Sequence, residues 1–115
     1  MRLPPDSLIA PEKVTCYLLV PQVRSDKSGF LALAGYTRGC PERLLADLRD
    51  LLHAGDADFL EENVFGRLYE VAGRLRGPNG RVLRVRTIWM TDHLSGLTKF
   101  VTLMPVRHGY PGHED

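Results

Sequence analysis

Arginine side chains gather in one predicted hairpin of this 115-residue chain, and they are the residues best suited to chemistry. Arg74, Arg84 and Arg86 alternate with apolar residues on the two sides of the turn at residues 77–80. Guanidinium groups stay charged at every cellular pH and can bind phosphate oxygens through two parallel hydrogen bonds. The pattern therefore predicts a surface for a polyanion, and we favour RNA. The alternative is a solvated sheet face of long arginine side chains.

The register of the hairpin decides where these arginines lie. A Pro-Asn-Gly turn suits a bulged hairpin in which Gly80 takes the left-handed conformation and Gly77 lies opposite Arg81. Arg74 then lies directly across from Arg84. The other possible register, with Gly77 opposite Gly80, would mix apolar and charged side chains on both faces, so we favour the bulged one. Like charges placed opposite each other destabilise a sheet, and a bound anion would relieve that repulsion.

A metal-independent ribonuclease needs cations that stabilise the pentavalent phosphate, together with an acid and a base. We predict Arg86 as the principal cation because it sits mid-strand, with Arg84 and Lys99 as helpers. Glu70 lies diagonal to Arg86 in the bulged register. We expect Glu70 to orient Arg86 rather than act as a base, because neighbouring guanidinium groups stabilise its ionised form. These four residues are the predicted catalytic set, with His93 and His108 as reserve acids.

A second set of residues is predicted to bind RNA without taking part in the chemistry. It comprises Arg74, Arg76, Thr102 and Lys27. A basic sheet face serves binding as well as cleavage, so the sequence leaves open whether the protein is an enzyme.

No motif for a metal or cofactor accompanies these residues. The chain has no Walker loop and no GxGxxG, HExxH or GxSxG motif. Its four histidines lack the spacing of metal ligands, and Cys16 and Cys40 form neither a CxxC motif nor a disulfide framework. We expect no metal, no cofactor and a reduced compartment. The chain also lacks a bilayer-length apolar run and the layout of a signal peptide, which predicts a cytoplasmic protein without a membrane segment.

The elements that must position the arginines follow from the apolar periodicity. The chain is predicted to form a single domain over residues 1–115, with an extended arm at 1–10 and a flexible tail at 106–115. Helices are expected over residues 11–19, 27–34 and 41–54, and strands over 67–76, 81–90 and 98–104. The fold class is therefore α+β, with three short N-terminal helices packed on one face of a C-terminal antiparallel meander of at least three strands. Trp89 is expected to be buried under the helices.

Charge is unevenly distributed along this layout. Residues 41–65 carry two positive and seven negative side chains, whereas residues 66–108 carry eight positive and two negative. Residues 56–63 are predicted to form an acidic connector. This separation indicates one face for a polyanion and a different face for another partner.

Five short motifs occur in an order that resembles a known family. They are Lys13 to Leu19, Lys27-x-x-Phe30 followed by Gly35-Tyr36, Gly77 to Arg81, Val85 to Trp89, and Val101 to Pro105. Together they resemble a bacterial family of domains of unknown function, whose members occur in polymorphic toxins and as small stand-alone proteins. The layout of helices followed by a meander also resembles the RelE, barnase and colicin class of nucleases.

The resemblance implies an RNase-like toxin domain that is neutralised by a small antitoxin or immunity protein. Two alternatives stay open. One is a non-catalytic module that binds RNA or a protein through the same face. The other is an antitoxin or immunity-type protein, for which the acidic residues 56–62 would be the binding element. The oligomeric state is not indicated by the sequence.

Overall fold

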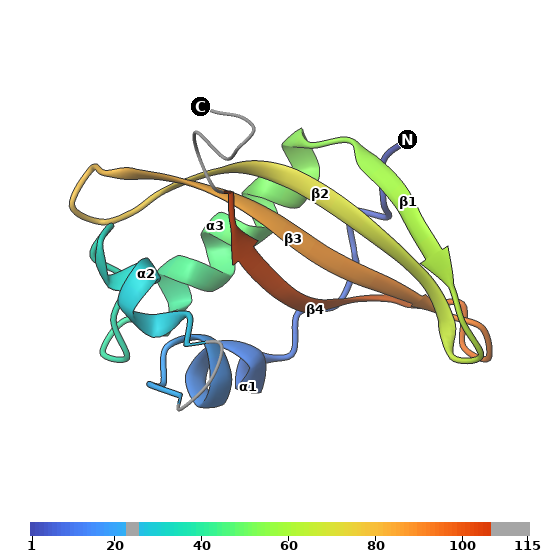
Figure 1. Ribbon diagram of the computed structural model, residues 1–115, viewed down its shortest axis with the longest axis horizontal. Coiled ribbons are helices and arrows are strands. Elements are labelled where there is room, and N and C mark those ends of the chain that lie inside the picture. Colours follow the sequence, from blue (N-terminus) through green and yellow to red (C-terminus); the bar gives the residue numbers. More distant parts are fainter. Residues whose placement is uncertain (23–25, 107–115) are drawn as a thin grey trace.

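A four-stranded antiparallel sheet, in the order β1-β2-β3-β4, carries helices on one face (Figure 1). Its strands are β1 (Ala57–Glu62), β2 (Gly66–Arg76), β3 (Val82–Asp92) and β4 (Thr98–Pro105). This computed structural model describes residues 1–22 and 26–106. The α+β class and the antiparallel meander are confirmed. The predicted acidic connector is wrong, because it forms β1; its acidic residues, which are rare in strands, are tolerated at the sheet edge.

The prediction of three short helices is only partly correct. The first segment is a single turn, α1 (Pro11–Lys13), which continues as the π-helix η1 (Val14–Leu18). The second helix, α2 (Ser28–Ala32), is shorter than expected. The third, α3 (Pro41–Ala54), has 14 residues and packs its leucine stripe against the sheet, mainly on β2. Helical packing on the sheet therefore rests chiefly on α3.

Trp89 lies at the centre of the core, as predicted, with 0% of its surface exposed. Its ring packs edge-on against Phe100, with the ring centroids 5.3 Å apart. Its indole Nε1 donates a hydrogen bond to Thr87 Oγ1 at 2.8 Å, and Thr87 Oγ1 donates to the carbonyl of Val71 at 2.6 Å. The buried polar groups next to the tryptophan are thus satisfied within the sheet.

The β2–β3 hairpin adopts the bulged register that the turn sequence predicts. Arg74 pairs with Arg84, the amide of Gly77 donates to Arg81, and Gly80 has a φ of 87°. The turn also packs closely on the end of α2, since a Cβ on Gly77 would overlap the carbonyl group of Ala34. Glycine is required at residue 77 for this close approach.

The N-terminal segment, predicted as an extended arm, contacts both edges of the sheet. Leu8 exchanges backbone hydrogen bonds of 2.8 Å with Thr98 and Phe100 on β4. At the other edge, the amide of Ala57 donates to the carbonyl of Met1 at 2.6 Å. The predicted tail lies outside the described residues except for Val106. Within the described parts of the chain, no helix has the length and apolar character needed to cross a bilayer.

Candidate functional site

Arg74, Arg84, Arg86 and Glu70 form one cluster on the sheet face opposite the core, which we call the arginine surface. The amide of Val106 donates to the carbonyl of Arg84 at 2.9 Å, so the backbone groups of Arg84 face β4. Arg74 and Arg84 are therefore a non-hydrogen-bonded pair, the kind in which opposing side chains lie closest. Both are exposed, and no carboxylate among residues 1–22 and 26–106 forms an ion pair with either.

Arg86 is held by Glu70, as the diagonal placement predicted. Both Nη2 and Nε of Arg86 donate to Oε1 of Glu70, at 2.6 and 2.9 Å. The Glu70 side chain is only 18% exposed, whereas that of Arg86 is 43% exposed. Within the described chain, Arg86 Nη1 has no partner, so it is free to bind an anion. The pair fixes the guanidinium plane while leaving one amino group available.

A hollow of about 300 Å³ lies beside the Arg74–Arg84 pair. It is lined by Ala72, Gly73, Arg74, Arg84, Val85 and Val106. This volume is at the lower end of the range for small-molecule sites. The two guanidinium groups at its wall, which form no ion pair among the described residues, make it suited to a phosphate group.

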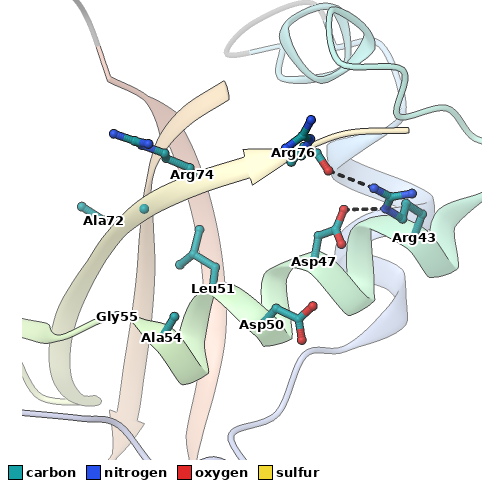
Figure 2. Close-up of a pocket in the computed structure, with 10 residues that line it drawn as sticks. Arg43, Asp47, Asp50, Leu51, Ala54, Gly55, Ala72, Arg74 and Arg76 are labelled. Atoms are coloured by element: carbon teal, nitrogen blue, oxygen red, sulfur yellow. Dashed lines mark hydrogen bonds and ion pairs between the residues drawn. The ribbon is translucent and has the colours of Figure 1, made fainter. Parts of the chain in front are cut away.

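A larger groove of about 540 Å³ lies on the other side of β2, between that strand and α3 (Figure 2). Leu51 points from α3 toward the strand, and Arg74 and Arg76 extend from β2 away from the helix. Asp47 and Asp50 stand on the helical wall. The groove therefore combines an apolar floor with acidic and basic walls.

Arg43 closes one end of this groove. Its Nε donates to Asp47 at 2.8 Å, and its Nη2 donates to the carbonyl of Arg76 at 3.0 Å. The hydroxyl of Tyr36 donates to the same Asp47 oxygen at 2.6 Å. Burial, and then the carboxylate of Asp47, raises the pKa of Tyr36 well above its usual value. This network ties the start of α3 to the end of β2.

Of the other predicted site residues, Lys99 lies away from the arginine surface, whereas Thr102 lies opposite Ile88, the next residue after Arg86 on that sheet face. Lys99 pairs with Met90, four residues along β3 from Arg86, which corresponds to about 13 Å. Thr102 hydrogen-bonds the hydroxyl of Tyr17 at 3.1 Å, and the Lys27 ammonium lies 6.0 Å from the centroid of the same ring. Lys99 therefore does not lie next to Arg86. Thr102 and Lys27 both interact with Tyr17, through its hydroxyl and its ring respectively.

Tyr17 is the residue that the sequence interpretation missed. The sequence interpretation included it only within the motif Lys13 to Leu19. The available signal was Lys13, four residues earlier, whose ammonium lies 5.7 Å from the ring centroid. Arg76 continues the line of Arg74 along β2, opposite Val82.

The histidines do not supply an acid to the arginine surface within the described chain. His93 lies in the turn after β3, and its Nε2 is 3.2 Å from the carboxylate of Glu62. Nε2 of His53 contacts the carbonyl of Pro5. His108 lies outside the described residues. Among those described, no three histidine, cysteine or acidic side chains gather in a way that could hold a metal ion.

Exposed apolar side chains occur on β1 and at the turns that follow β1 and β3, and the two turns lie side by side in Figure 1; we call these side chains the exposed apolar patch. The amide of His93 donates to the carbonyl of Phe65 at 3.0 Å, which joins the two turns. The most exposed member, Leu94, is 99% accessible. The other members are Phe59, Leu60, Val64, Phe65 and Leu97. Several exposed apolar side chains on neighbouring segments are a feature of protein contact sites.

Comparison with known proteins places the chain in a family. The family model described as a domain of unknown function, DUF6883, matches residues 5–107. The chain belongs to this family. The resemblance to a family of domains of unknown function is thereby confirmed, whereas the relation to RNases stays a prediction. A search of curated proteins found no match.

A solved structure with a similar fold comes from Klebsiella pneumoniae 342. It is a chain of a contact-dependent growth inhibition toxin–immunity protein complex, with 13% sequence identity and a TM-score of 0.59. The similarity covers 89% of this DUF6883 protein and 95% of that chain. At this identity the match shows a common fold.

Proposed function

We propose that this DUF6883 protein is an RNase-like toxin domain, which binds RNA on the arginine surface and cleaves it without a metal ion. The observation that carries the proposal is the Arg74–Arg84 pair, two exposed cations without an ion pair in the described chain, beside an Arg86 that Glu70 orients. The repulsion between the two arginines destabilises the protein when no RNA is bound, and a bound phosphodiester would relieve it. The fold shared with a chain of a toxin–immunity complex supports the toxin assignment.

The cleavage step proposed here uses the RNA's own nucleophile. The 2′ oxygen attacks the neighbouring phosphorus, the bond to the 5′ oxygen breaks, and the 2′ proton passes through water to that leaving oxygen. Negative charge gathers on the non-bridging oxygens, where Arg84 and Nη1 of Arg86 donate. Glu70 keeps Arg86 in position before the reaction, which is how preorganised donors stabilise a transition state. The products are a 2′,3′-cyclic phosphate and a 5′-hydroxyl.

The experiment is an RNA cleavage assay in excess EDTA with a 5′-labelled single-stranded RNA. Wild type is compared with Arg86→Ala, Glu70→Gln and the control Arg38→Glu, whose exposed side chain lies outside the arginine surface. A fully 2′-O-methylated RNA of the same sequence tests the nucleophile. We expect wild type and Arg38→Glu to cleave, both site variants to lose most activity, and the methylated RNA to bind uncut.

Three results would contradict the cleavage proposal. Activity that disappears with EDTA would eliminate the metal-free mechanism. Full activity in Arg86→Ala would eliminate the site. Binding without cleavage of any RNA would leave the arginine surface as a binding site and assign the protein as a non-catalytic RNA-binding module.

A second candidate function is that of an immunity-type protein, and the exposed apolar patch at the hairpin turns favours it. Glu61, from the acidic segment 56–62, lies beside this patch on β1 and would select a basic partner surface. A growth test separates the two functions. A toxin domain harms the host when expressed alone and is tolerated with its neutralising partner, whereas an immunity-type protein is harmless alone.

A further inference from the structure

The edge of β2 facing away from β3 is open between residues 72 and 76. Pairing with β1 ends at Val71, opposite Ala57. The amide of Asn63 donates to the carbonyl of Gly66, and Arg43 donates to the carbonyl of Arg76. Even-numbered residues of β2 therefore direct their backbone groups away from β3. The amide and carbonyl of Arg74 and the amide of Arg76 consequently point to this edge, where no described backbone group pairs with them.

The groove beside this edge has the shape and chemistry of a vacant strand position. Its floor is formed by Leu51 and Ala54 of α3 (Figure 2). Leu51 lies directly against Gly73 of β2. The side chains of Arg74 and Arg76 lie on the opposite sheet face. A strand added here would alternate in the same way, with one set of side chains toward the apolar floor and the other beside the two arginines.

We propose that the open edge of β2 accepts an extended segment of a protein partner, in which acidic residues alternate with small apolar ones. Acidic residues opposite Arg74 and Arg76 would neutralise two cations that form no ion pair within the described chain. The apolar residues would cover Leu51 and Ala54. The backbone of the segment would satisfy the exposed groups of β2, which is the usual source of affinity in strand addition.

This mode of binding couples the partner to the proposed RNA site, because both use the guanidinium group of Arg74. An acidic segment on the β2 edge competes with a phosphodiester on the arginine surface. The coupling rests on the proposed function, whereas binding of the segment itself does not require RNA. The two are therefore measured separately.

The probe is the peptide acetyl-Thr-Val-Glu-Val-Glu-Val-Thr-amide, added to the ¹⁵N-labelled full chain without RNA. Its two glutamates have the spacing of Arg74 and Arg76, and we expect the peptide to run antiparallel to β2, the direction in which residues directly opposite each other exchange backbone hydrogen bonds. One control peptide carries lysine in place of both glutamates. Two further peptides are N-methylated, either at both glutamates, whose amides face β2, or at the two flanking valines, whose amides face away.

We expect the glutamate peptide to bind with a dissociation constant below about 1 mM and to slow amide hydrogen exchange at Arg74 and Arg76 severalfold. The lysine peptide and the peptide methylated at glutamate should bind at least about tenfold more weakly. The peptide methylated at valine should retain binding. Arg74→Glu should favour the lysine peptide, whereas the control Arg38→Glu should leave the preference unchanged.

Equal binding of the glutamate and lysine peptides would overturn the proposed partner chemistry. Binding without protection of the Arg74 amide, or equal loss with either methylated peptide, would overturn strand addition. Protection of that amide that rises with protein concentration in the absence of peptide would assign the edge to a second copy of the chain. A failure of peptide binding would overturn the proposed strand site and leave the RNA assays valid. If the peptide binds, its competition with RNA is measured separately by fluorescence anisotropy.

Discussion

Reversing one charge of the Arg74–Arg84 pair should stabilise the protein while removing its proposed activity. Arg84→Glu replaces a like-charge pair with an opposite-charge pair at the closest type of cross-strand position. Both side chains are exposed, so the substitution creates no cavity and buries no new charge. A gain in stability together with a loss of RNA binding indicates that the arginines are retained for binding rather than for folding.

The expected gain follows from two small contributions. Removing the repulsion and adding an attraction are each worth a few tenths of a kcal/mol at a solvated sheet face, giving about 0.5–1 kcal/mol in total. For a domain of this length, that corresponds to a rise of about 2–4 °C in Tm. At 1 M salt the Debye length falls to about 3 Å, so most of the gain should disappear.

The assay is thermal unfolding followed by circular dichroism in 20 mM and 1 M NaCl. The control variant is Arg38→Glu, which has the same net charge as Arg84→Glu. Arg38→Glu should change Tm by less than Arg84→Glu, because Arg38 lies opposite no other arginine. RNA affinity at low salt should fall about tenfold or more in Arg84→Glu alone. A lower Tm for Arg84→Glu, or a gain that persists in 1 M salt, would refute the repulsion argument.

Three further predictions concern the framework of the site. Trp89→Ala should cost about 3–5 kcal/mol of unfolding free energy, measured by urea denaturation with circular dichroism because the only tryptophan is removed. Tyr36→Phe should cost about 2 kcal/mol at pH 7 through the lost hydrogen bond to Asp47. Because the pKa of Tyr36 is raised in the folded state, wild-type stability should fall as the pH rises above about 10, and the difference between the two proteins should shrink there. Gly77→Ala should cost about 1–3 kcal/mol, because its Cβ would overlap the carbonyl of Ala34; an unchanged urea midpoint would contradict this close packing.

The hairpin was predictable because its local signals agree. The Pro-Asn-Gly turn and the alternation of apolar and charged residues select the same register. β1 was not predictable in the same way, since Asp58, Glu61 and Glu62 are poor strand formers and the strand depends on pairing with β2. The π-helix was missed because apolar spacing does not distinguish it from an α-helix over a single turn.

The candidate site was predictable where it depends on register and not where it depends on tertiary packing. The diagonal Glu70–Arg86 pair follows directly from the bulged hairpin. The contact between Tyr17 and Thr102 joins residues 85 positions apart, which no local pattern reports. The open edge of β2 follows from the point at which β1 begins, at Ala57 opposite Val71, and it could not be recognised once β1 was taken for a connector.

The most direct test of the central claim is the salt dependence of RNA binding. A labelled single-stranded RNA is titrated by fluorescence anisotropy over a series of KCl concentrations, with wild type, Arg38→Gln and the double variant Arg74→Gln/Arg84→Gln. If these two arginines bind phosphates, the double variant should bind more weakly, and its log–log salt slope should be shallower by about 0.7 for each lost contact. Arg38→Gln should match wild type. Equal affinity and equal slope for the double variant and wild type would contradict the assignment of the arginine surface as the RNA site.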